Sequence, residues 1–272
     1  LDKGIEASPY VVAAEDFESG AVAIATQEDR YKNNIQVQTS EVHTGTYAGV
    51  KRWTQGEAST VARVTFPPSL HGKDARPAYF VRVCYNFDKS FHPGGDASKG
   101  VGVKGFGVAI KGNTNTPCDG TNWYNAQVQF VGWGPSAKPD ANNKYLWVGH
   151  NYSYNPDPHG AVATEGTKKV TSAYRLSVYP SPHRYIKFDS WNCYEVGLYL
   201  NTPGKNDGEA RYWVNGVLES RITNVRYRDT PTLFPTHANL NMYRTTTNFP
   251  QTMVRYVDNI VIARRYIGPV KR

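Results

Sequence analysis

The sequence has few of the features that mark helical, membrane-spanning or zinc-binding proteins. It contains only two methionines and few stretches rich in alanine, leucine and glutamate, residues that favour helices. No apolar run approaches the roughly 20 residues that a membrane-spanning helix needs. None of the three cysteines, Cys84, Cys118 and Cys193, belongs to a Cys-x-x-Cys pair, which disfavours a zinc site. Three cysteines allow at most one disulfide, and the sequence leaves its pairing open.

The basic composition is not accompanied by a dense lysine or arginine run, a basic helix or a nucleic-acid-binding motif. The 31 basic residues exceed the 23 acidic ones, which gives a formal net charge of +8. Solubilising surface charge and attraction to an acidic polymer are both open interpretations. We favour the acidic polymer and expect neither a nucleic-acid nor a membrane partner.

The first residue is Leu1 rather than methionine. This start fits a mature protein whose signal peptide has been removed, although a chosen expression boundary would look the same. We therefore expect a secreted, extracellular protein, and we expect it to be a monomer.

The stretch from Trp191 to Asp229 predicts an antiparallel meander. Apolar residues alternate with others over 191–200, as in a half-buried strand, and Pro, Gly, Asn and Asp fill the turn at 203–208. The next strand, 210–214, ends in Asn215-Gly216, the strongest short hairpin signal. No helix-period pattern competes, so the fold class is all-β.

The remaining strands indicate one domain. Aromatic residues make up 13% of the chain, a composition suited to half-buried strands. We find no internal repeat, low-complexity segment or domain-scale linker, and we predict a single domain over residues 1–272. The other main strands are expected at 60–66, 79–87, 122–134, 145–154, 174–179, 237–243 and 254–266.

Polar residues lie at alternate positions of several expected strands. In 79–87 the valines and aromatics form the core face, so Arg82 and Asn86 belong to the other face, where Arg82 could bind a carboxylate or form a surface salt bridge. Glycines surround Lys104, which would stand at the edge of a cleft. Gln127 and Gln129 share the outward face of 122–134, where they could be solvated or bind a carboxylate or sugar hydroxyls.

A histidine and two tyrosines, His150, Tyr152 and Tyr154, share one parity of the expected strand 145–154. They could act as general base and acid, or form an aromatic core strip with one hydrogen-bonded histidine. Asn239, Asn241 and Tyr243 share one parity of 237–243.

Carboxylates gather at Glu15, Asp16 and Glu18 beside an expected turn. They could bind calcium, although a solvated acidic turn is the favoured interpretation. We expect no required cofactor, with a structural calcium ion as the open alternative.

Several of these segments, in this order, resemble the polysaccharide lyases of the alginate lyase and glucuronan lyase type, families fourteen and twenty. The resemblance covers roughly residues 79–229. Its most specific part is the hairpin, a structural feature that many concanavalin-like jelly rolls share in similar form. The matching segments are Y-F-V-R-V-C-Y-N-F, G-V-G-V-K-G-F-G, Q-V-Q-F-V-G-W-G, Y-S-Y-N-P-D-P-H-G and L-N-T-P-G-K-N-D-G-E-A-R-Y-W-V-N-G.

This resemblance implies a concanavalin-like β-jelly roll with an open cleft on its concave sheet, and cleavage of a uronic-acid polymer by β-elimination. Lys104 would take the position of the family's cleft lysine, and Tyr152 and Tyr154 those of its catalytic tyrosines. Gln127 and Gln129 would take the place of a polar pair whose second member is commonly arginine in the family.

The chemistry of β-elimination calls for such residues. Removing the C5 proton of a uronate places negative charge on its carboxylate, so donors must stabilise that group while one side chain takes the proton and another protonates the leaving O4. We assign the base role to Tyr152 or Tyr154, with His150 as helper or acid. Residues expected to contact the substrate are Arg82, Asn86, Gln127, Gln129, Trp133, Trp147, Asn241 and Tyr243. Lys104, Arg82 and the overall positive charge are expected to lower the pKa of the tyrosine.

Two other functions are open. A non-catalytic carbohydrate-binding jelly roll would use Trp133, Trp147, Tyr145 and Tyr243 as stacking platforms. A glycoside hydrolase would need two carboxylates facing each other across the cleft, and only Glu195 and Glu209 lie in expected strands. Alginate, glucuronan and a glycosaminoglycan are the open candidates for the polymer.

Overall fold

The computed structural model describes residues 4–24, 35–54, 60–67, 76–91, 102–110, 116–132, 145–152, 161–172, 175–180, 186–244 and 252–270. Within these ranges, residues 60–62, 102–104, 131–132, 145–152, 169–172, 175–176 and 241–244 are described by strand position alone. Apart from a short 3₁₀ turn at Ile5–Ala7, the regular secondary structure of the described residues consists of β-strands, as predicted. No helix among the described residues has the length and apolarity to cross a membrane.

One sheet has nine strands, in the order β2-β3-β16-β5-β12-β13-β14-β9, with β1 paired to β16. Its pairings are antiparallel. The strands are β1 (Val11–Glu15), β2 (Gln36–Gln38), β3 (Ala48–Trp53), β5 (Ala78–Phe87), β9 (Val162–Glu165), β12 (Trp191–Tyr199), β13 (Gly208–Val214), β14 (Val217–Val225) and β16 (Met253–Ala263).

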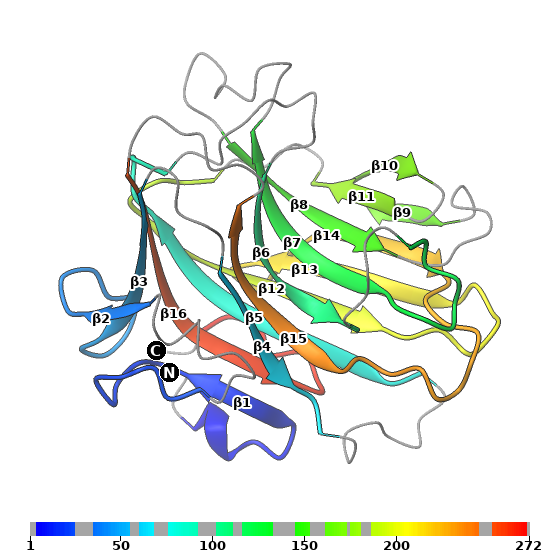
Figure 1. Cartoon of the computed structure of the whole chain (residues 1–272), viewed down its shortest axis with the longest axis horizontal. Coiled ribbons are helices and arrows are strands. Elements are labelled where there is room, and N and C mark those ends of the chain that lie inside the picture. The colour runs from blue at the N-terminus through cyan, green and yellow to red at the C-terminus, as the bar shows by residue number, and fades with distance from the viewer. Residues whose placement is uncertain are drawn as a thin grey trace.

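The other sheet has seven antiparallel strands, in the order β10-β11-β8-β7-β6-β15-β4, and lies across the first in Figure 1. Strands from distant parts of the chain are neighbours in it, since β15 lies between β4 and β6. The strands are β4 (Thr60–Thr65), β6 (Gly102–Ala109), β7 (Asn125–Gly132), β8 (Tyr145–Tyr152), β10 (Thr167–Ser172), β11 (Arg175–Tyr179) and β15 (His237–Arg244).

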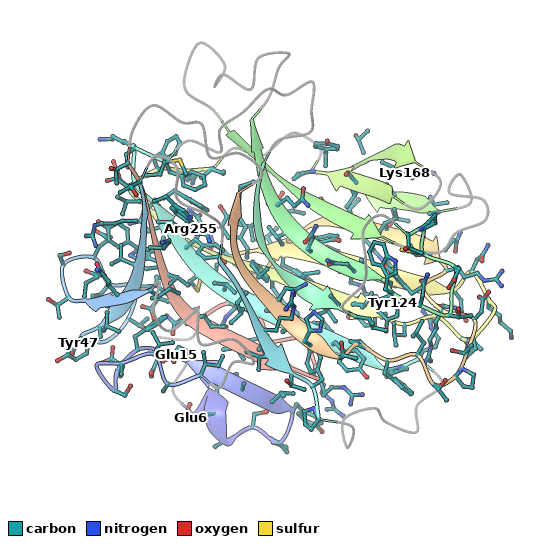
Figure 2. The ribbon with its side chains drawn as sticks, viewed as in Figure 1. Glu6, Glu15, Tyr47, Tyr124, Lys168 and Arg255 are labelled. Carbon is teal, nitrogen blue, oxygen red and sulfur yellow. A yellow bond between two sulfur atoms is a disulfide. The ribbon has the colours of Figure 1, made fainter. Side chains whose placement is uncertain are left out.

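Aromatic side chains join the two sheets into a sandwich. Phe130 of the seven-stranded sheet packs against Tyr85, Phe87 and Tyr194 of the nine-stranded sheet, with ring centroids 4.7–5.7 Å apart. Arg255 of β16, labelled in Figure 2, is also fully buried, with its guanidinium 4.4 Å from the centroid of the Tyr85 ring. The core therefore lies between the sheets, and each sheet also has an outer face.

The predicted meander is confirmed as β12, β13 and β14. Tyr194, Val196 and Leu198 of β12 are at most 2% exposed, as their shared parity predicted. The Asn215-Gly216 turn has φ of 50° and 82°, the left-handed conformation that a tight hairpin requires.

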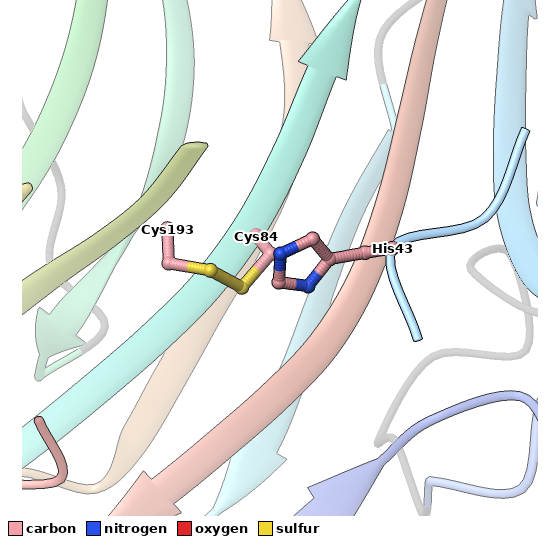
Figure 3. A group of neighbouring side chains, drawn as sticks. All are labelled: His43, Cys84 and Cys193. Carbon is pink, nitrogen blue, oxygen red and sulfur yellow. A yellow bond between two sulfur atoms is a disulfide. The ribbon is translucent and has the colours of Figure 1, made fainter. Parts of the chain in front are cut away.

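The one disulfide among the described residues joins Cys84 of β5 to Cys193 of β12. These residues stand directly opposite each other in the pairing of the two strands, while Cys118 is free and buried. The His43 ring lies beside the disulfide in Figure 3 and 5.3 Å from the Trp191 ring. The sequence left the pairing open, and the register between β5 and β12 decides it.

Removing this disulfide by Cys84→Ala and Cys193→Ala is expected to lower the free energy of unfolding by about 2–5 kcal/mol. The cross-link closes a loop of 109 residues, and releasing it gives the unfolded chain more conformational entropy. Urea unfolding of both forms measures the difference. Cys118→Ala is the matched control, and an unfolding midpoint for the double variant equal to that of the wild type would contradict the expectation.

Candidate active site

The outer face of the seven-stranded sheet brings together most of the predicted catalytic residues. Residues that alternate with the candidates in β6, β7 and β15 belong to the core. They are Phe106, Val108, Ala126, Val128, Phe130, Ala238 and Leu240, each at most 2% exposed. The intervening positions therefore form the opposite, outer face.

Directly paired residues share a face of the sheet, so the register defines three rows across the strands. The central row consists of Arg63, Asn239, Gly107, Gln127, His150, Ser177 and Lys169. The Lys104 row consists of Tyr243, Lys104, Gln129 and Val148. The Tyr152 row consists of Thr65, His237, Ala109, Asn125, Tyr152 and Arg175.

Gln127 lies at the middle of this arrangement. It is 1% exposed, and its Nε2 has no hydrogen-bond partner among the described residues. Its Oε1 lies 3.5 Å from Nδ2 of Asn125, whose own buried Oδ1 also lacks a partner in the described part of the chain. A buried amide group without a hydrogen-bond partner lowers the stability of the folded protein, and a ligand that bonds to it removes this cost. The pair offers such a ligand one donor, Nε2 of Gln127, and one acceptor, Oδ1 of Asn125.

A glycine beside Gln127 allows β6 to lie close to β7. A Cβ added at Gly107 would come within 2.7 Å of the Cα of Gln127. Gly105 is also confined, since its Cβ would meet the Phe130 ring at 2.9 Å. The glycines around Lys104 thus serve strand packing, and a bulge between Lys104 and Gly107 keeps both residues on the outer face.

Two predicted substrate-binding residues lie elsewhere. Arg82 and Asn86 belong to β5 in the nine-stranded sheet, on the face turned away from the core, as their alternation with core residues predicted. Nη1 of Arg82 donates to the Gly268 carbonyl, and Nδ2 of Asn86 donates to Glu41. Because the sandwich core separates them from Gln127, their assignment to the same site is wrong.

The strand position of Trp147 corrects the prediction that this residue contacts the substrate. Trp147 pairs with Phe130, a fully buried core residue, so its position belongs to the core face of β8. His150 and Tyr152 occupy the outer face of that strand. Asn241 pairs with Val61, on the same parity as Asn239. Trp133 and Tyr154 lie outside the described residues, and the open cleft stays a prediction.

The two carboxylates considered for a glycoside hydrolase have other partners. Glu195 accepts hydrogen bonds from the backbone N–H groups of Ile267 and Gly268, at 2.9 and 3.0 Å. Burial acts to raise the pKa of Glu209, but hydrogen bonds from Arg211 and Arg221 outweigh it and keep the pKa below its usual value. Both lie on the nine-stranded sheet, so neither faces Gln127.

The acidic turn near the N-terminus is held by hydrogen bonds. Oε1 of Glu15 accepts from the N–H of Phe17 at 2.8 Å, and Oε2 accepts from the N–H of Ile24 at 2.7 Å. Glu18 accepts from the N–H groups of Thr46 and Tyr47, both at 2.9 Å. Glu18 is exposed, as a solvated turn predicts, but Glu15 is only 3% exposed and is held by backbone N–H groups rather than by water. The calcium ion stays a prediction.

Several residues of the three rows were not predicted from the sequence as site residues. Arg63 pairs with Asn239, and Arg175 pairs with Tyr152. Asn125 and His237 were also not selected. A lone arginine between core positions in 60–66 was a visible signal for Arg63, since Val64 is a core residue.

Solved structures similar to this chain include polysaccharide lyases. A mutant of the alginate lyase Aly36B in complex with alginate trisaccharide has a TM-score of 0.63 and 13% identity, over 95% of this chain and 100% of that chain. Alginate lyase vAL-1 from Chlorella virus has a TM-score of 0.60 and 15% identity, over 94% and 100%. An endo-β-1,4-glucuronan lyase from the fungus Trichoderma reesei has a TM-score of 0.52 and 11% identity, over 94% and 96%.

No protein-family model and no curated protein matches the sequence. At these identities the structural similarity shows the fold. It confirms the predicted jelly-roll sandwich and the resemblance to alginate and glucuronan lyases at that level.

Proposed function

We propose that this protein is a polysaccharide lyase that cleaves a uronic-acid polymer by β-elimination on the outer face of its seven-stranded sheet. The observation that carries the proposal is the charge of that sheet. Its seven strands contain no aspartate or glutamate, and the three rows of its outer face contain two histidines and four cationic residues, Arg63, Lys104, Lys169 and Arg175. A polymer with one carboxylate per sugar is attracted to such a surface, and a carboxylate-dependent hydrolase has no catalytic pair there.

The amide pair would hold the carboxylate of the sugar that reacts. Nε2 of Gln127 is a buried donor with no partner among the residues that the structure describes, as a group that binds carboxylate oxygen should be before substrate arrives. Gln129 lies two residues along the same strand, beside Lys104. These donors would stabilise the charge that spreads onto the carboxylate when C5 loses its proton.

Tyr152 would be the base, with His150 as the acid. The C5–H electron pair forms the C4–C5 double bond as Tyr152 takes the proton, the C4–O4 bond breaks, and His150 protonates O4. These two residues lie two positions apart on β8, beside Asn125 and Gln127 respectively. Tyr154, the alternative base, remains a prediction.

A tyrosine becomes a base near neutral pH only when a cation lowers its pKa, which is about 10 when unperturbed. Arg82 cannot do this from the other sheet, and Lys104 lies two strands and two rows from Tyr152. Arg175 is the direct neighbour of Tyr152 on β11. We therefore assign this electrostatic role to Arg175.

Arg175→Gln is expected to move the alkaline rise in kcat upward by about one pH unit or more, because the active tyrosinate loses its neighbouring positive charge. The measurement is a pH–rate profile of wild type and variant on the same polymer. Arg52→Gln, on the other sheet, is the matched control. A profile unchanged by Arg175→Gln would assign the tyrosine's activation to another group.

The test of the function itself is ultraviolet absorbance of the unsaturated uronate during incubation with polymannuronate, polyguluronate, polyglucuronate and a neutral glucan. We expect a rise on at least one polyuronate and none on the glucan. Polyuronate binding without a rise would overturn the lyase assignment in favour of a non-catalytic binding protein. The absence of both binding and cleavage would overturn the polyuronate assignment.

A further inference from the structure

The central row crosses the whole seven-stranded sheet, and a cationic residue stands at each end. Arg63 lies on β4 and Lys169 on β10, the two edge strands of this sheet. Between them lie only uncharged polar residues, a glycine and His150. Positive charge is thus placed at the two points where an extended ligand along the row would enter and leave the sheet.

The length of this row can be compared with that of a polysaccharide. Seven strands give six spacings of about 4.8 Å, so the two cations lie about 29 Å apart along the row. The length that one pyranose ring adds to an extended 1,4-linked chain is comparable to one strand spacing. The row is therefore matched to a segment of about six to seven uronate residues.

We propose that the central row is a binding track for a polyuronate lying across the strands, and that Arg63 and Lys169 bind carboxylates of sugars near its two ends. This inference rests on the proposed function and deepens it. It makes Arg63 and Lys169 binding residues for long substrates, without a direct part in the elimination.

The position of Arg63 fits this role. Its neighbour Val64 is 5% exposed in the core, which places Arg63 on the outer face, where it is half-buried. A guanidinium held in this way can bind a carboxylate through two parallel hydrogen bonds. Arg63 lies four strands from β8 and Lys169 lies two, so the track extends further on the Arg63 side of the reacting sugar.

The experiment measures kcat and KM on a size series of oligouronates, from trimer to octamer, made from the polymer that the absorbance assay identifies. For the wild type we expect kcat/KM to rise with length up to about six or seven residues. Arg63→Gln and Lys169→Gln are each expected to raise KM for the octamer by roughly 10-fold, as loss of a charge-assisted hydrogen bond does, with kcat and trimer cleavage unchanged. Arg52→Gln is the matched control for loss of one positive charge.

The possible outcomes distinguish a failure of the binding track from a failure of the proposed lyase function. If the wild type cleaves the polymer but Arg63→Gln and Lys169→Gln match Arg52→Gln on the octamer, the track is overturned and the lyase assignment stands. If kcat falls equally on trimer and octamer, these residues act on the reaction or the fold, and the track is also overturned. If no polyuronate is cleaved or bound, both proposals fail.

Discussion

Replacing Tyr152 with phenylalanine is expected to lower kcat by about 10²–10⁴-fold, the usual contribution of a positioned acid or base. The substitution removes only the phenolic oxygen, which would take the C5 proton. Substrate binding through Gln127 and the cations is left intact, so the dissociation constant for polyuronate should change little. The measurement pairs the absorbance assay with equilibrium binding, for example by calorimetry.

Tyr145→Phe is the matched control for this prediction. Tyr145 lies on the same strand but pairs with Gly132, on the parity of Trp147 rather than that of Tyr152. It should keep wild-type activity. Unsaturated product formed by Tyr152→Phe at the wild-type rate would remove Tyr152 from the base role and make Tyr154→Phe the next variant to measure.

Alternation along the strands was sufficient to predict the faces of individual strands. Gln127 and Gln129 were expected opposite Ala126, Val128 and Phe130, and these three are buried in the core. The hairpin at Asn215-Gly216 was equally local, because its turn residues require a positive φ. Such signals need no knowledge of distant residues.

The assignment of strands to sheets could not be predicted in this way. Arg82 alternates with core valines just as Gln127 alternates with core residues, but β5 joins the nine-stranded sheet. Two strands with the same pattern therefore placed their polar residues on opposite outer faces of one sandwich. Only the long-range pairing of β5 with β12 and β16 decides between them.

Register explains the residues that the sequence did not select. Arg63 and Asn239 are separated by 176 residues of chain but are direct neighbours on β4 and β15. Arg175 becomes a candidate for lowering the pKa of Tyr152 only because the two residues are paired on neighbouring strands. No short-range pattern carries such pairings, because the alternation of a strand gives its face but not its partner.

Gln127 is the residue whose change should most affect substrate binding. Gln127→Glu replaces the free Nε2 donor with an oxygen acceptor and adds a negative charge where the substrate's carboxylate would bind. We expect kcat/KM to fall by about 10²–10³-fold, as loss of one donor to a developing oxyanion does. Burial would also raise the pKa of the new carboxyl group, so part of the activity should return as the pH falls and the group becomes neutral.

Gln127→Leu separates the effect of the added charge from the effect of the lost hydrogen bond. Leucine removes the donor without adding a charge, so it should weaken catalysis less than glutamate does and without the recovery at low pH. Gln36→Glu, the same change on an exposed residue of β2, is the control for altered net charge. Full kcat/KM in both Gln127 variants would show that the buried amide does not contact the substrate, and the reacting sugar would then have to be placed along the Lys104 row, beside Gln129.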